Sequence, residues 1–174
     1  MELFEAIVKR HSYRGAFTDA TVSQEDLRRI VQAGIQAPSG KNEQTTSFVI
    51  VHDPDVLRQA AAIINRPVCQ TAKAMIVCVT DPRPVFHDLS FHVEDCSAAV
   101  ENMLLEITAL GYATVWLDGV LRLDNVAQRL AELLAVPKGH TVRIVLPLGV
   151  PAEVCEQKEK LPFDQRAWFD RYGG

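Results

Sequence analysis

The order of the apolar segments restricts the fold of this chain more than any other feature of its sequence. Two segments with apolar residues at helical spacing, residues 3–8 and 27–35, come before the first segment with the character of a strand, residues 48–51. A doubly wound α/β sheet alternates strands and helices more regularly than this. The order therefore argues against that architecture.

Three further strands are expected after the first. The continuous apolar run at residues 74–80 predicts a buried central strand, because a strand that is covered on both faces needs no polar alternation. Residues 113–117 and 141–148 also predict strands. We therefore expect a sheet with the run at residues 74–80 near its centre.

The boundaries of several helices are also visible in the sequence. Ser23 resembles a capping residue for the second helix, and Asp53 is expected to open a third. Residues 93–110 form the longest periodic segment, and Gly111 follows it where a glycine can end a helix. A last helix is expected to begin near Asp124.

Composition and charge indicate an ordinary globular protein. The chain has 174 residues, 48% hydrophobic and 23% charged, so we expect a single domain spanning residues 1–174. The net charge of -4 argues against a nucleic-acid-binding protein. No apolar run approaches membrane-spanning length, and charged residues interrupt the N-terminal apolar segment. We therefore expect no membrane partner and a cytoplasmic protein.

The familiar motifs for metals, nucleotides and nucleophilic catalysis are missing from the sequence. The four cysteines form no Cys-x-x-Cys pair and have no histidine at zinc-site spacing, so we expect reduced, mostly buried thiols and no metal site. Neither the Gly-x-Gly-x-x-Gly fingerprint nor the Walker-type loop is present. Any nucleotide must therefore be held by side chains and helix ends.

The segment Arg-His-Ser-Tyr-Arg at residues 10–14 is the strongest candidate for a binding site. Arg10, Ser12 and Arg14 are spaced two apart, directly after the first amphipathic helix. Guanidinium groups present several fixed donors that match phosphate oxygens, so the segment could bind an anion. Two arginines near a helix end are also typical of a solvated surface. The interpretation therefore depends on what the rest of the chain supplies.

Five separated segments, in order, resemble the nitroreductase family of FMN-dependent oxidoreductases over nearly the whole chain. Residues 10–14 are similar to the family's opening motif, in which the first Arg and the Ser bind the flavin phosphate. Arg14 falls where the family places a cation beside the pyrimidine edge of the flavin. Residues 37–44 match the Pro-Ser-x-x-Asn-x-Gln loop that reaches the flavin of the other subunit.

The remaining three segments lie further along the chain. Asn65 stands at the position of the family's flavin-contacting Asn, and residues 111–119 are similar to the strand and loop whose backbone approaches N5 of the flavin. Lys158 and Lys160 match a basic pair that completes the phosphate site in relatives. The resemblance implies these cofactor-binding residues: Arg10, His11, Ser12, Arg14, Pro38, Ser39, Gly40, Asn42, Asn65, Trp116, Leu117, Asp118, Gly119, Lys158 and Lys160.

The resemblance also implies a fold and an activity. The fold would be α+β, with a central, mostly antiparallel mixed β-sheet flanked by helices, in a homodimer with FMN at the subunit interface. NADH or NADPH would reduce the flavin, and a small-molecule acceptor such as a quinone or nitroaromatic would reoxidise it, by ping-pong hydride transfer. No side chain is expected to be a catalytic acid, base or nucleophile; Arg14 would tune the flavin. Two alternatives stay open: a flavin-binding carrier or sensor without turnover, and an FMN-dependent oxidase or dehydrogenase.

Three departures from the family pattern affect the expected pocket. Thr45 and Thr46 stand where many members have Pro-Trp, and Val68 stands where some larger members have a Lys near the flavin. A short connection, residues 81–92, replaces the region where larger members insert lid helices. We therefore expect a more open site.

Overall fold

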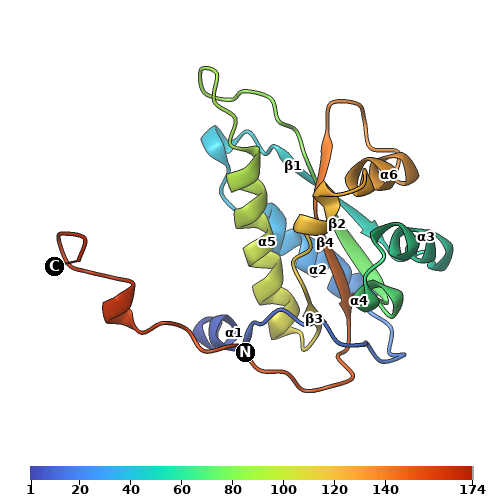
Figure 1. Ribbon diagram of the computed structural model, residues 1–174, viewed down its shortest axis with the longest axis horizontal. Coiled ribbons are helices and arrows are strands. Elements are labelled where there is room, and N and C mark those ends of the chain that lie inside the picture. The colour runs from blue at the N-terminus through green and yellow to red at the C-terminus, as the bar shows by residue number, and fades with distance from the viewer. Residues whose placement is uncertain (174) are drawn as a thin grey trace.

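A four-stranded antiparallel sheet lies at the centre of the computed structural model, which describes residues 1–173 (Figure 1). Its strands, in the order β1-β2-β4-β3, are β1 (Thr46–Val51), β2 (Ala74–Thr80), β4 (Thr141–Gly149) and β3 (Ala113–Thr114). The expected central strand is confirmed, because β2 pairs with β1 on one side and with β4 on the other.

Alternate residues of β2 face two separate hydrophobic clusters. All seven residues of the strand are buried. Ala74, Ile76 and Cys78 belong to the cluster shared with helices α2 and α5, whereas Met75 and Val77 belong to the cluster on the other face. Because successive side chains of a strand point to opposite faces, one apolar run serves both clusters.

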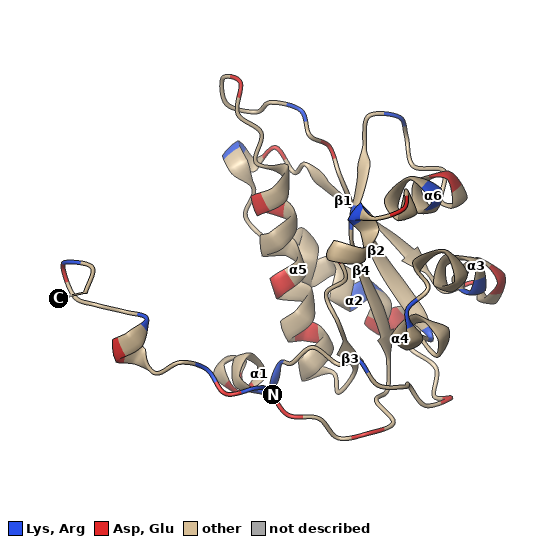
Figure 2. Ribbon diagram, in the orientation of Figure 1, with Lys and Arg blue, Asp and Glu red and all other residues tan. Residues whose placement is uncertain are grey.

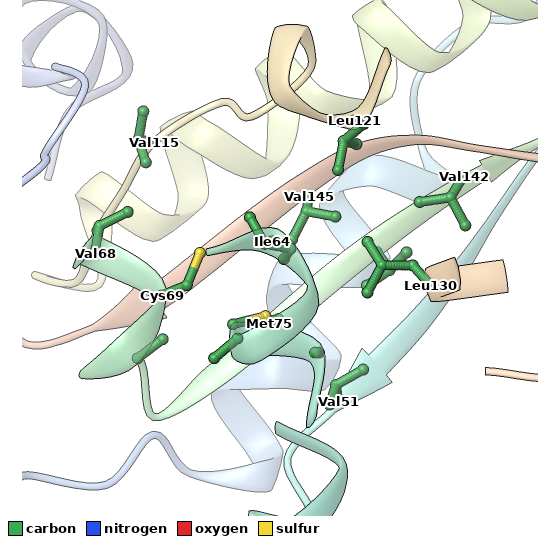
Figure 3. Packing of buried hydrophobic residues seen from close by; sticks show 14 of the residues in the cluster. Val51, Ile64, Val68, Cys69, Met75, Val115, Leu121, Leu130, Val142 and Val145 are labelled. Atoms are coloured by element: carbon green, nitrogen blue, oxygen red, sulfur yellow. The ribbon is translucent and has the colours of Figure 1, made fainter. Parts of the chain in front are cut away.

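Helices cover both faces of the sheet (Figure 1). One face is covered by α2 and α5, and the other by α3, α4 and α6. Figure 3 shows side chains of the second cluster, including Ile64, Met75 and Leu130, converging from helices and sheet. The helices are α1 (Leu3–Lys9), α2 (Gln24–Ile35), α3 (Pro54–Ile64), α4 (Pro67–Gln70), α5 (His92–Ala109) and α6 (Val126–Leu133), with short 3-10 turns η1 (Gly40–Asn42), η2 (Gly119–Arg122) and η3 (Phe163–Gln165).

Local hydrogen bonds fix the helix ends that the sequence predicts. The Ser23 hydroxyl accepts a hydrogen bond from the amide of Asp26 at 3.0 Å. Asp53 Oδ1 accepts from the two amides that follow Pro54, both at 3.0 Å. After α5, Gly111 has a φ of 82° and its amide donates to the carbonyl of Thr108. These three positions act as caps, as expected.

The structure corrects two expectations about the sheet. The strand expected at residues 113–117 pairs regularly over only two residues, and the chain then leaves the sheet and returns to it at a single bridge between Leu117 and Val145. Every pair that the four strands form is antiparallel, so the expected mixed sheet has no parallel pair within the described chain. The α+β class is confirmed.

The cysteines match the expectation of reduced, mostly buried thiols. Cys69, Cys78 and Cys96 are buried, Cys155 is exposed, and all four are free thiols. Burial raises the pKa of the Cys69 thiol to about 12. Because the thiolate is the reactive form of cysteine, Cys69 is a packing residue.

The C-terminal arm, residues 152–173, leaves the body of the protein beside α1 and extends away from it (Figure 1). After β4 the chain turns at Pro151, which forms an isolated bridge with Phe17. The arm then carries little regular structure apart from η3. Among the helices of residues 1–173, none is long and apolar enough to cross a membrane.

Truncation of a core leucine tests how much the sheet depends on β4. Leu146 is fully buried in the cluster beneath α5, and it pairs in register with Ile76. We expect Leu146→Ala to lower the free energy of unfolding by about 2–5 kcal/mol, measured by urea denaturation at fixed protein concentration. The matched control Leu123→Ala, at a side chain that is 55% exposed, should change it by about 0.5 kcal/mol or less. Equal losses in the two variants would contradict this assignment of the core.

Candidate functional site

A cationic hollow of about 460 Å³ lies between the segment after α1 and the C-terminal arm. The structure brings together here the predicted residues from opposite ends of the chain, and Figure 2 shows basic positions of the arm beside α1. The lining residues whose side chains carry hydrogen-bond donors are Arg10, His11, Ser12, Arg14, Gln157, Lys158 and Lys160, and two carboxylates, Glu153 and Glu156, line it as well. Such a set of donors suits a phosphate group.

Hydrogen bonds between distant parts of the chain build this hollow. The amide group of Gln157 donates to the carbonyl oxygens of Arg10 at 2.5 Å and of Ile7 at 3.3 Å, at the C-terminal end of α1. These carbonyls have no partner inside the helix, so a side chain of the arm satisfies them. Gln157 therefore fixes Lys158 and Lys160 beside the first arginine.

The buried Tyr13 holds the base of the arm. Its hydroxyl donates to the carbonyl of Ala16 and accepts from the amide of Ala152 at 3.1 Å. The same amide also lies 3.0 Å from the carbonyl of Ala16. These contacts tie the chain after β4 to the segment after α1, so the cationic hollow rests on a rigid base.

Arg10 is oriented by a carboxylate without being fully paired. Its Nε lies 3.7 Å from Oε1 of Glu101 on α5, and the Arg10 side chain is only 20% exposed. This separation is longer than a hydrogen bond, so the guanidinium keeps donors for another anion. Arg14 is exposed, and its Nη1 donates to the carbonyl of Ser12 at 3.2 Å.

His11 carries a buried nitrogen without a hydrogen-bond partner among the described residues. Its Nδ1 lies 3.0 Å from the carbonyl oxygen of Lys9 and therefore donates to it, because a carbonyl only accepts. The unpartnered atom is therefore Nε2. His11 is one of the residues that line the hollow.

A second group of predicted residues lies apart from the hollow, in the loop that precedes β1. Pro38, Ser39, Gly40 and Asn42 belong to this loop, which packs against the N-terminal end of α5. The cationic hollow lies beside α1 and the other half of α5 (Figure 1). None of the residues of the loop lines the hollow in the described chain. Within one subunit the structure therefore separates the two groups.

Asn65 and residues 116–119 also lie outside the hollow. Asn65 ends α3 in the left-handed conformation, with a φ of 51°, and its side chain is exposed. Trp116 and Leu117 are half-buried against the core, and Gly119 has open space where a side chain would project. The loop that contains Gly119 is therefore free to be approached closely.

Asp118 is held by two arginines. Its carboxylate accepts two hydrogen bonds from Arg122, at 2.8 and 2.6 Å, and Oδ1 lies 3.3 Å from Nη1 of Arg143. The hydrogen bond from Arg122 lowers the pKa of Asp118, partial burial opposes this, and the charge of Arg143 adds to the lowering. The Asp118 side chain is thus occupied by the two arginines. Contacts of this loop with a ligand are therefore expected to come from its backbone.

Sequence reasoning did not identify Gln157, Glu101 or Asp95, although each organises one part of the site. Gln157 and Glu101 contact Arg10 across long sequence separations. In the sequence, Asp95 has the pattern of an ordinary acidic residue in the first turn of a helix. No local pattern distinguishes these residues from surface positions.

Comparison with known proteins agrees with the fold. The model of the nitroreductase family matches residues 7–77 and 76–150. A protein of Archaeoglobus fulgidus, named as a candidate NADH dehydrogenase/NAD(P)H nitroreductase, is 36% identical over 171 residues, covering 98% of this chain and 95% of that protein. A relative from Methanothermobacter thermautotrophicus with the same name is 32% identical and covers 88% of this chain and 79% of its own length.

A solved structure with a related title has the same fold. The NADPH:FMN oxidoreductase of Vibrio harveyi, in complex with NAD⁺, superposes with a TM-score of 0.82 at 26% identity. It covers 98% of this chain and 77% of its own. The family match and these relatives define the class of the protein as an oxidoreductase. The chain belongs to the nitroreductase family.

The Asp118 ion pairs predict a pH dependence of stability. Because the pKa of Asp118 is lowered by folding, its contribution is fully present above the ordinary pKa of a carboxyl group and is lost as pH falls through the lowered value. We expect Asp118→Asn to destabilise the protein at pH 7 by about 1 kcal/mol or less. The difference from the wild type should shrink towards pH 3, as measured by urea denaturation at both pH values.

The control for this prediction is Asp88→Asn, in the exposed connection between β2 and α5. This carboxylate takes part in none of the ion pairs of residues 1–173, so its replacement should leave stability unchanged at both pH values. A loss in Asp118→Asn that is equal at pH 7 and pH 3 would rule out the ion pairs as its cause.

Proposed function

We propose that this chain is an FMN-dependent NAD(P)H oxidoreductase that reduces quinones, nitroaromatics or a related electron-poor acceptor. The observation that carries the proposal is the hollow that joins Arg10 and Ser12 to Lys158 and Lys160. This set of donors suits the terminal phosphate of a mononucleotide. Membership of the nitroreductase family and the names of the relatives support the choice of FMN and of a nicotinamide donor.

The phosphate would be held from both ends of the chain. Arg10 and Ser12 would bind it from the segment after α1, and Lys158 and Lys160 from the arm. His11, which lines the same hollow, would lie beside the phosphate. Charge-assisted hydrogen bonds of this kind are about twice as strong as neutral ones, so they would dominate the affinity for the cofactor.

The other residues would orient the ring of the cofactor and tune it. Arg14, exposed at the rim of the hollow, would place a positive charge beside the pyrimidine edge and stabilise the negative charge that gathers there on reduction. Asn65 and the segment from Trp116 to Gly119 would contact the ring, with backbone amides near Asp118 facing N5. Bound FMN supplies the two-electron chemistry, in ping-pong order between the nicotinamide and the acceptor.

The proposed working form is a homodimer. Leu3 and Phe4 expose large apolar side chains on α1, and Val154, Phe163 and Phe169 do so along the arm. Exposed apolar side chains gathered in this way are typical of protein interfaces. A second copy of the chain would cover them and would bring its Ser39–Asn42 loop to the cofactor in the hollow of the first. The separation of the two groups of site residues in one subunit supports this arrangement.

The short connection between β2 and α5 favours an open acceptor site. It contains only a bridge between Phe86 and Leu89, and both side chains are substantially exposed. No lid helix forms among residues 81–91. An open site of this kind suits acceptors of varied shape. It also leaves room for the alternative of a flavin-binding carrier without turnover.

Spectroscopy of the purified protein distinguishes these functions. We expect it to bind FMN, to lose the flavin absorbance on anaerobic addition of NADH or NADPH, and to recover it when a quinone is added. Bleaching by neither nicotinamide would favour the carrier, and oxygen uptake with an organic substrate alone would favour an oxidase. A protein that binds no FMN would contradict the proposal as a whole.

Replacement of Arg10 tests the phosphate site directly. We expect Arg10→Ala to weaken FMN binding by about 1.5–3 kcal/mol, because a charge-assisted contact is lost, as measured by fluorescence titration. The matched control is Arg58→Ala on α3, where the arginine is largely exposed and its one ion pair within residues 1–173 is with Asp55. An unchanged affinity in Arg10→Ala would remove this residue from the site.

A further inference from the structure

A buried carboxylate joins the two ends of the loop that precedes β1. Asp95, in the first turn of α5, is 5% exposed. Its Oδ1 accepts a hydrogen bond from the backbone amide of Gly40 at 2.7 Å, and its Oδ2 accepts one from the hydroxyl of Thr45 at 2.6 Å. None of the ion pairs within residues 1–173 includes Asp95. These two hydrogen bonds are therefore its main compensation for burial.

A buried carboxylate that has no cationic partner is costly to keep, unless hydrogen bonds replace its lost hydration. A hydrophobic residue of similar size would avoid that cost at this position. The two donors that face Asp95 both belong to the loop, one before and one after its tip. Both hydrogen bonds of the Asp95 carboxylate therefore go to the loop.

The backbone of the loop has a shape that needs such support. Lys41, Asn42 and Gln44 have φ values of 51°, 60° and 52°, in the left-handed region that residues other than glycine rarely adopt. Conformations of this kind persist only where the surroundings impose them. Ser39 contributes one restraint, because its hydroxyl accepts from the amide of Gln44 at 3.0 Å.

Neighbouring residues restrict the loop further. A side chain at Gly40 would come within 2.5 Å of the ring of Phe91, so the loop packs closely against the start of α5. On the outer side, Arg83 donates to the carbonyl of Glu43 at 2.9 Å. The Asp95 clamp, defined here as Asp95 with its hydrogen bonds to Gly40 and Thr45, joins both sides of the tip from outside the loop, whereas the hydroxyl of Ser39 joins them from within it.

We propose that Asp95 and Thr45 are positioning residues, which hold the Ser39–Asn42 loop in the shape in which it contacts FMN in the partner subunit. This inference rests on the proposed function, because it assigns the clamp a role in that cofactor site. The hydroxyl of Thr45 is the side-chain donor of the clamp, and it is buried together with Asp95.

Replacement of Thr45 tests the clamp. Thr45→Val keeps the shape of the side chain but removes its donor, and we expect it to weaken FMN binding about tenfold, as a lost hydrogen bond to a buried charge should. Thr45→Ser keeps the hydroxyl and should bind FMN as the wild type does. Equal affinity in Thr45→Val and Thr45→Ser would overturn the proposal. If Thr45→Val fails to fold, Thr45→Ala serves as the variant without a donor.

Mixed dimers separate a positioning role from a general loss of stability. In a dimer of one Arg10→Ala subunit and one Thr45→Val subunit, one site combines the intact hollow of the second with the intact loop of the first. The other site carries both defects. We therefore expect half of the sites to bind FMN with wild-type affinity, although each variant alone binds weakly. The absence of any wild-type site would show that the clamp does not act across the interface.

These measurements also separate this inference from the proposed function. If Arg10→Ala weakens FMN binding and Thr45→Val does not, the clamp has no role in cofactor binding and the phosphate site stands. If Arg10→Ala binds FMN as the wild type does, the phosphate site itself is wrong, whatever the outcome at Thr45.

Discussion

Complete burial of β2 is the constraint on which the rest of the structure depends. All seven residues of this strand are buried, its backbone pairs with β1 and β4, and both of its faces are apolar. A strand with no polar face requires a layer of helices on each side, because either face would otherwise expose hydrophobic surface to water. The long helix α5 belongs to one of these layers, and both separated groups of site residues contact it: Gly40 at Asp95 in its first turn and Arg10 at Glu101 further along.

Features that depend on neighbours in sequence were predictable, and features that depend on distant partners were not. The caps at Ser23 and Asp53 and the turn at Gly111 follow from residues within four positions of them, and all three are present. The strand expected at residues 113–117 is shorter in the structure, because only its first two residues pair with β4, a partner distant in the sequence. Gln157 depends on a carbonyl 147 residues away, and nothing in its own surroundings in the sequence indicates that bond.

The candidate site shows the same division. The donors at Arg10, Ser12 and Arg14 are visible as a motif, because their spacing already brings them together. Their conjunction with Lys158 and Lys160 could be inferred only through resemblance to a family, and the structure places all five around one hollow. Because these cations come from distant segments, neither segment contains a long run of like charges that would repel itself in the unfolded chain.

The carboxylate beside Arg10 explains how such a site can remain folded before it binds an anion. Clustered cations repel one another, and the two carboxylates in the lining, Glu153 and Glu156, offset only part of the charge of the two arginines and two lysines there. Glu101 lowers that repulsion at a distance of 3.7 Å, close enough to orient the guanidinium and too far to occupy its donors. Its own side chain is 52% exposed, so water weakens the pair further. The phosphate group of the proposed cofactor would therefore displace Glu101 from the arginine at little cost, which a tightly paired, buried carboxylate would not permit.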